Sequence, residues 1–113
     1  MQLSTIFNFS ASHFLTKYHG KCENLHGHNY KLIVTVEGKV GKDGMVIDYK
    51  EIKKTVNDLV IDKIDHTHLN DLMDNPSSEH LVLWIWKALK DELPLKNIRL
   101  YETENYYCDY DGK

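Results

Sequence analysis

Apolar and polar positions alternate toward both ends of this chain, and a period of two is typical of half-buried strands. Near the N-terminus the apolar positions share a parity with His13, which predicts a strand over residues 3–13. A second alternating run predicts a strand from about His28 to Gly38. Residues 98–103 alternate in the same way, and residues 106–110 are expected to pair back on them as a short hairpin partner.

Two segments between these strands carry apolar residues at helical spacing. Asp48 begins the first with a sequence like that of a capping box, and this helix is expected to end near Lys63. The second is expected to begin within residues 75–78 and to run to about Leu93, where a proline stops it. Its apolar face is wide, which indicates packing on more than one side. The order strand, strand, helix, helix, strand, strand predicts an α+β fold, with an antiparallel sheet and both helices on one face.

Composition and charge narrow the class of protein. The chain has 113 residues, 42% of them apolar and 27% charged, which predicts a single globular domain over residues 1–113. Its net charge of -3 provides no basic field for a nucleic-acid backbone, so nucleic acid is not expected as a partner. Without an apolar run of membrane-spanning length or a targeting segment, we expect a soluble, cytoplasmic protein with no membrane partner. The 7 histidines are the unusual feature.

Three of these histidines are expected to converge. His26 and His28 are two residues apart at the start of the second strand, so their imidazoles point to the same side. His13 lies on the apolar face at the end of the first strand. If the two strands form a hairpin, the three rings meet on one face. Three neutral imidazoles with an open fourth position form the ligand set of a catalytic zinc ion.

Cys22 lies four residues before His26 in the sequence CENLHGH, and this spacing allows two interpretations. As a fourth ligand it would complete a closed, structural zinc site. As a thiol beside the metal it would act as a nucleophile or base, because nearby positive charge favours the thiolate. Cys108 has no such neighbours, and we interpret it as a packing or edge residue.

Two acidic residues are further candidates. Asp65 directly precedes His66, and a carboxylate can orient an imidazole and raise its basicity as in a proton relay; the alternative is a polar loop between helices. Glu102 shares the parity of the apolar residues of its strand, so its carboxylate is expected to point toward the core. Burial of a carboxylate is costly. Either the strand frays there, or Glu102 binds a ligand with two adjacent donors, such as a pterin or guanine edge.

Several segments, taken in order, resemble those of one known family. They are FSASH at 9–13, CENLHGH at 22–28, GMVIDY at 44–49, Asp65-His66, PSSE at 76–79 and Tyr101-Glu102-Thr103. Together they span nearly the whole chain and are similar to the 6-pyruvoyltetrahydropterin synthases and their bacterial relatives, the 6-carboxytetrahydropterin synthases. The short gap between Cys22 and the HGH sequence resembles the 6-carboxytetrahydropterin branch, which feeds the synthesis of queuosine and other 7-deazapurines.

The resemblance implies the tunnelling fold, in which two helices lie on a four-stranded antiparallel sheet. In that fold trimers close a barrel, and two trimers stack as a homohexamer with active sites at the subunit interfaces. The resemblance also implies Zn2+ as cofactor and a role for each matching residue. The implied roles are zinc binding by His13, His26 and His28, general base catalysis by Cys22, proton relay by Asp65 and His66, and anchoring of the pterin ring by Glu102.

The reaction implied by the resemblance converts 7,8-dihydroneopterin triphosphate to 6-carboxy-5,6,7,8-tetrahydropterin, acetaldehyde and triphosphate. Three alternatives stay open, namely 6-pyruvoyltetrahydropterin synthase activity on the same substrate, a structural zinc-binding module without catalysis, and a pterin-binding relative that does not turn the triphosphate over. The chain departs from the family where Phe14 and Asn24 stand in place of common basic residues, and Arg99 is its single arginine. The triphosphate is therefore expected to contact lysines such as Lys17 or Lys21, or a neighbouring subunit.

Overall fold

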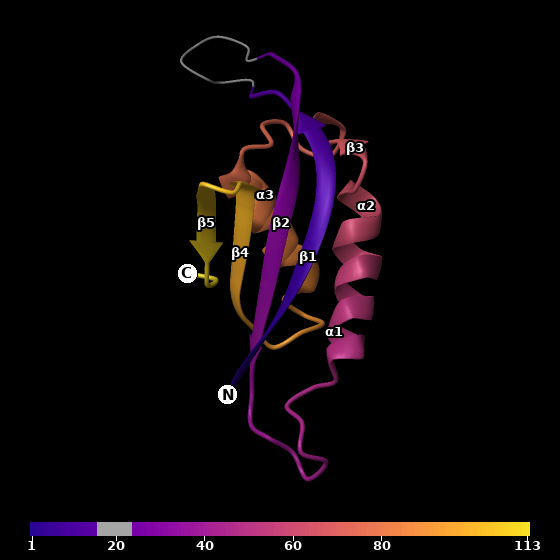
Figure 1. Cartoon of the computed structure of the whole chain (residues 1–113), viewed down its shortest axis with the longest axis vertical. Helices are drawn as coiled ribbons and strands as arrows, with labels where there is room; N and C mark the ends of the chain where they lie inside the picture. The colour runs from indigo at the N-terminus through magenta and orange to yellow at the C-terminus, as the bar shows by residue number, and fades with distance from the viewer. Residues whose placement is uncertain (16–23) are drawn as a thin grey trace.

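Two long strands form the centre of the fold. The computed structural model describes residues 1–15 and 24–113. Strand β1 (Gln2–His13) pairs antiparallel with β2 (His26–Glu37) along its whole length, as Figure 1 shows. The predicted start of the second strand near His28 is therefore two residues late. The register places the end of β1 beside the start of β2, which is the hairpin arrangement that the histidine pattern requires.

The described strands form a five-stranded sheet in the order β3-β1-β2-β4-β5. Strands β4 (Leu95–Thr103) and β5 (Tyr106–Tyr110) pair antiparallel as predicted, and β4 also pairs antiparallel with β2. Strand β3 (Thr67–His68) pairs in parallel with β1. The predicted four-stranded antiparallel sheet and its ββααββ order are therefore wrong in this respect, because the sheet is mixed and has a fifth strand. Two residues are too few to produce a recognisable alternation.

Two helical segments follow the predicted positions. Helix α1 (Tyr49–Val56), a π-helical turn (Asn57–Ile61) and α2 (Asp62–Ile64) succeed one another, and the Asp48 side chain caps the start by accepting from the Lys50 N–H. Helix α3 (Ser78–Leu89) ends earlier than the predicted Leu93. The chain turns after α3 because Leu93, only 4% exposed, folds back into the core before β4 begins. None of the helices in the described ranges has the length and apolar content to cross a membrane.

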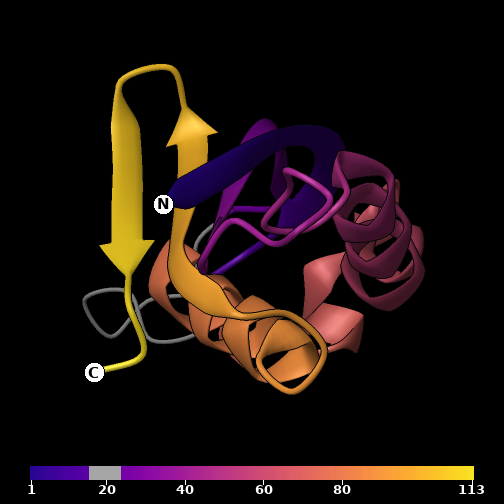
Figure 2. The ribbon, with the colours of Figure 1, turned by 90° about the horizontal axis from the view of Figure 1, so that it is seen from below.

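The helices cover one face of the sheet, so the molecule has two layers (Figure 2). Helices α1 and α2 pack against β1, and α3 packs against β4 and β5. The alternating residues of each long strand point into the layer between sheet and helices, where burial of apolar surface stabilises the fold. The largest apolar side chains fully buried there are Tyr30, Leu32, Ile52, Ile64, Leu69, Leu81, Ile85, Leu89, Ile98 and Leu100.

Candidate metal centre and active site

His13, His26 and His28 come together at one end of the sheet. The register of β1 and β2 places His13 directly opposite His26, and His28 lies two residues further along the same face. The ring centroid of His13 is 4.6 Å from that of His26 and 5.0 Å from that of His28. The centroids of His26 and His28 are 4.7 Å apart. One ligand atom from each of the three lies within 4.8 Å of the others. These three histidines could hold a metal ion.

Backbone carbonyls set the protonation of two of these rings. His13 Nδ1 lies 2.7 Å from the carbonyl oxygen of Pro76, and His26 Nδ1 lies 2.9 Å from that of Asn24. A carbonyl oxygen can only accept, so Nδ1 carries the proton in each neutral ring and Nε2 keeps its lone pair. Hydrogen bonds of this kind orient histidines that bind metals.

The spacing of the two Nε2 atoms tests whether a metal fits. Those of His13 and His26 lie 3.0 Å apart. Two lone pairs at this distance repel each other unless a cation lies between them. Nitrogen ligands of a tetrahedral zinc ion, with bonds of about 2.0–2.1 Å, are about 3.3 Å apart. The donor atoms therefore fit a small divalent metal, which the three histidines would hold with a fourth position available to a ligand.

Tyr30 lies below the histidines on the same face of β2. Its ring centroid is 5.6 Å from that of His28 and 6.3 Å from that of His13, and it stacks on Phe9 at 4.8 Å. Burial raises the pKa of the Tyr30 hydroxyl well above its ordinary value, and the negative charge of Glu102 raises it further. Tyr30 therefore stays uncharged beside the histidines.

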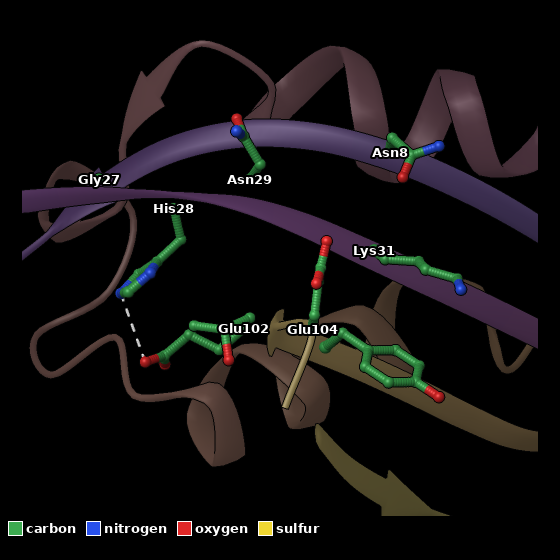
Figure 3. A pocket seen from close by; sticks show the side chains of 9 residues that line it. Asn8, Gly27, His28, Asn29, Lys31, Glu102 and Glu104 are labelled. Atoms are coloured by element: carbon green, nitrogen blue, oxygen red, sulfur yellow. Dashed lines mark ion pairs between the residues drawn. The ribbon is translucent and has the colours of Figure 1, made fainter. Parts of the chain in front are cut away.

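Glu102 faces the histidines from β4. The pairing of β2 with β4 ends at Lys31 and Tyr101, and beyond this point the two strands separate. Glu102 Oε1 lies 3.3 Å from His28 Nε2 across the gap, as Figure 3 shows, and Oε2 accepts a hydrogen bond of 2.7 Å from the Ser78 hydroxyl. Of the two alternatives for this residue, fraying is wrong, because β4 continues to Thr103 and the carboxylate is bonded within the chain.

A cavity of about 780 Å³ opens where β2 and β4 separate, and it connects His28 and Glu102 with the outer face of the sheet. Figure 3 shows this cavity, which is lined by Asn8, Gly27, His28, Asn29, Lys31, Tyr101, Glu102, Thr103 and Glu104. Its volume lies in the range of small-molecule sites. A polar heterocycle can therefore reach both the Glu102 carboxylate and His28.

Few cations line this cavity. Lys31 is the only lysine or arginine among the lining residues that the structure describes, and its Nζ lies 5.0 Å from the ring centroid of Tyr101. Arg99 is engaged elsewhere, because Asp109 accepts two of its hydrogen bonds, at 2.8 and 3.0 Å. This pairing lowers the pKa of the Asp109 carboxyl. Sequence reasoning missed Lys31, since it lies on the opposite parity from the histidines.

The Asp65 carboxylate and the His66 ring are in contact at the edge of the sheet. Asp65 Oδ1 lies 3.0 Å from His66 Nδ1 and accepts a hydrogen bond of 2.9 Å from the Ser10 N–H. His66 has a φ of 60°, an unusual value for a residue with a side chain, and its N–H donates to the Ser10 carbonyl at 2.6 Å. The His66 side chain is 84% exposed. It borders a second cavity of about 490 Å³, which shares His28 and Asn29 with the first.

Comparison with known families accounts for this arrangement. The profile described as 6-pyruvoyl tetrahydropterin synthase matches residues 2–113. The chain belongs to the 6-pyruvoyl tetrahydropterin synthase family. The match includes both histidine-bearing strands, the Asp65-His66 pair and Glu102, so every part of the candidate site lies within the family domain.

Members of this family that are similar to the chain carry different activities in their names. A 6-carboxy-5,6,7,8-tetrahydropterin synthase of Haemophilus influenzae is 31% identical over 137 aligned positions, covering 96% of this chain and 97% of the relative. A dihydroneopterin monophosphate aldolase of Pyrococcus furiosus is 42% identical over 88, covering 74% and 75%. The solved structure of a Caenorhabditis elegans 6-pyruvoyl tetrahydropterin synthase aligns with a TM-score of 0.88 and 28% identity, covering 100% of this chain and 96% of that one.

Neither cysteine is part of the site among the residues that the structure describes. Cys22, the expected general base of this family domain, lies outside the described residues, as do Lys17 and Lys21. Cys108 is half-buried on β5, where burial first and then the acidic groups Glu79, Asp109 and Glu102 raise the pKa of its thiol. A raised thiol pKa reduces the thiolate fraction, in keeping with a packing residue.

Sequence reasoning also missed two partners of the site. The Pro76 carbonyl orients His13, and the Ser78 hydroxyl binds Glu102. A backbone carbonyl has no signal in the sequence. Ser78 does stand in the PSSE segment that matched the family, and this was the available signal.

Proposed function

We propose that the protein is a zinc-dependent 6-carboxytetrahydropterin synthase. It converts 7,8-dihydroneopterin triphosphate and water to 6-carboxy-5,6,7,8-tetrahydropterin, acetaldehyde and triphosphate, a step in the synthesis of queuosine. The observation that carries this proposal is the cluster of His13, His26 and His28, with two inward Nε2 atoms and the Glu102 carboxylate beside it. The name of the Haemophilus influenzae relative and the short spacing from Cys22 to His26 support the 6-carboxy branch.

The chain supplies a position for the pterin ring and, next to it, the histidines for the side chain of the substrate. The Glu102 carboxylate accepts the two adjacent N–H donors of the pterin ring, since a carboxylate can bind such a pair in parallel. His28 and Glu102 line the same cavity, so a substrate held there by its ring lies near the histidines. Tyr30, buried next to His28, adds no charge to this region.

Zinc bound by the three histidines would acidify the hydroxyl groups of the substrate side chain and polarise a neighbouring carbonyl. The carbonyls of Pro76 and Asn24 hold His13 and His26 as Nδ1-protonated rings, so both present their Nε2 lone pairs without rearrangement. Cys22 removes the proton from the substrate side chain as general base.

The Asp65-His66 pair moves protons in the same reaction. With Asp65 bonded to Nδ1, the ring of His66 exchanges protons through Nε2, as in other carboxylate-oriented histidines. The His66 ring is 84% exposed and lines the second cavity, which includes His28 but not Glu102. We therefore assign this pair to the site of a neighbouring subunit in a homohexamer, where the sites lie at subunit interfaces.

Product analysis tests the proposed reaction. Purified protein loaded with zinc is expected to release acetaldehyde and triphosphate from 7,8-dihydroneopterin triphosphate in equal amounts. Chromatography of the pterin product and an alcohol dehydrogenase assay for acetaldehyde measure this. A pterin product that keeps the three-carbon side chain would indicate pyruvoyl-forming chemistry instead. Cleavage of dihydroneopterin monophosphate in preference to the triphosphate would favour the activity named for the Pyrococcus furiosus relative.

Mixed oligomers test the sharing of residues between subunits. Cys22→Ala and His66→Ala chains are each expected to be inactive alone. When the two are coexpressed in equal amounts, roughly a quarter of the sites receive an intact Cys22 and an intact His66, so activity should return to about a quarter of the wild-type level. If both residues came from one chain, the mixture would stay inactive. Chains carrying both substitutions, mixed with wild type, provide the control.

A further inference from the structure

The start of α3 holds the Glu102 carboxylate in place. The Ser78 hydroxyl donates to Glu102 Oε2 at 2.7 Å, and the two residues are 24 positions apart in the sequence. Building on the proposed function, in which Glu102 binds the pterin ring, we infer that Ser78 is a positioning residue for this recognition. Its hydroxyl fixes the orientation in which the carboxylate accepts two parallel donors.

The lone pairs of the carboxylate lead to this inference. An ionised carboxylate has about four acceptor positions, two on each oxygen. Ser78 occupies one position on Oε2. At least one position on each oxygen is left for a ligand, and these accept a pair of adjacent N–H groups such as the edge of a pterin. The last torsion of a glutamate is broad, so without Ser78 the carboxylate plane would rotate.

The segment 76–78 contacts both the histidine cluster and Glu102. The Pro76 carbonyl orients the metal-binding candidate His13, and the Ser78 hydroxyl orients Glu102. Between them, Ser77 accepts a hydrogen bond of 3.2 Å from the His80 N–H as the cap of α3. A single rigid helix start therefore sets the position of the carboxylate relative to the histidines.

The two adjacent serines provide a matched comparison. Both have the same hydroxyl and both lie at the start of α3, but Ser77 bonds to the helix and Ser78 bonds to Glu102. Ser77→Ala removes the cap and leaves the carboxylate bonded. Ser78→Ala removes the bond to the carboxylate and leaves the cap. Ser78→Thr keeps a hydroxyl at the position.

The experiment measures binding of 7,8-dihydroneopterin to the zinc-loaded full chain, together with KM and kcat for its triphosphate. A hydrogen bond to a charged group is worth enough to change binding by about tenfold or more. Ser78→Ala is therefore expected to raise the Kd and the KM about tenfold, with kcat changed less than about threefold and zinc content unchanged. Ser78→Thr should restore the wild-type Kd. Ser77→Ala should lower the Tm and leave the Kd as in wild type.

Three results would overturn the inference. These are an unchanged Kd in Ser78→Ala, an equal loss in Ser77→Ala, or a folded Ser78→Thr variant that binds as weakly as Ser78→Ala. If wild type binds dihydroneopterin and the serine variants differ as expected but the product is different, only the proposed reaction fails. If wild type binds no pterin, both are overturned.

Discussion

Cys22→Ala is expected to keep its zinc and to lose acetaldehyde formation from 7,8-dihydroneopterin triphosphate by a factor of about 10²–10⁴, the contribution typical of a general base. The three histidines could hold a metal without the thiol, because their ligand atoms lie within 4.8 Å of one another. Metal content is measured by atomic emission on the purified protein, and acetaldehyde by the coupled assay.

The chain offers a matched control for this substitution. Cys108→Ala removes the other thiol, which is half-buried and has a raised pKa, so activity and zinc content should both stay near the wild-type level. Loss of zinc from Cys22→Ala would give a different conclusion. Cys22, His13, His26 and His28 would then form a closed structural site, and the protein would be a zinc-binding module without this activity.

The alternation of apolar residues predicted more of this site than of the fold around it. A period of two determines which face of a strand each side chain occupies, so the convergence of His13 with His26 needed only the hairpin pairing of β1 and β2. The same rule directed Glu102 toward the core side of β4. Parity is a local property, and therefore the sequence alone is enough to assign it.

Features that depend on contacts between distant segments could not be predicted this way. Strand β3 forms because Thr67 meets Ala11 in parallel pairing, and two residues have no periodicity of their own. The π-helical turn over residues 57–61 and the positive φ of His66 decide where the Asp65-His66 pair lies, but neither has a pattern in the sequence. The contact of Asp65 with His66 was predicted, whereas the position of His66 at a second cavity that includes His28 was not.

His26→Ala is expected to weaken zinc binding by more than about a hundredfold, since changes to groups that merely support a metal ligand already cost 10- to 100-fold. A ligand that binds only the folded state raises its stability, so zinc should raise the Tm of wild type and leave that of His26→Ala unchanged. Thermal unfolding with and without added zinc measures both. His80→Ala is the control, because His80 is an exposed histidine outside the cluster and should keep the response to zinc.

The metal-free proteins separate a metal ligand from a structural histidine. Without metal, and at a pH where both rings are neutral, the Nε2 lone pairs of His13 and His26 face each other at 3.0 Å, and removal of one ring relieves this repulsion. Metal-free His26→Ala should therefore be at least as stable as metal-free wild type under these conditions. Because His26 stands at an open end of the sheet and its ring is only partly buried, its loss leaves no large cavity that would offset this gain. A variant that unfolds at a lower temperature than wild type without zinc, and still responds to zinc, would show that His26 supports the fold and does not bind the metal.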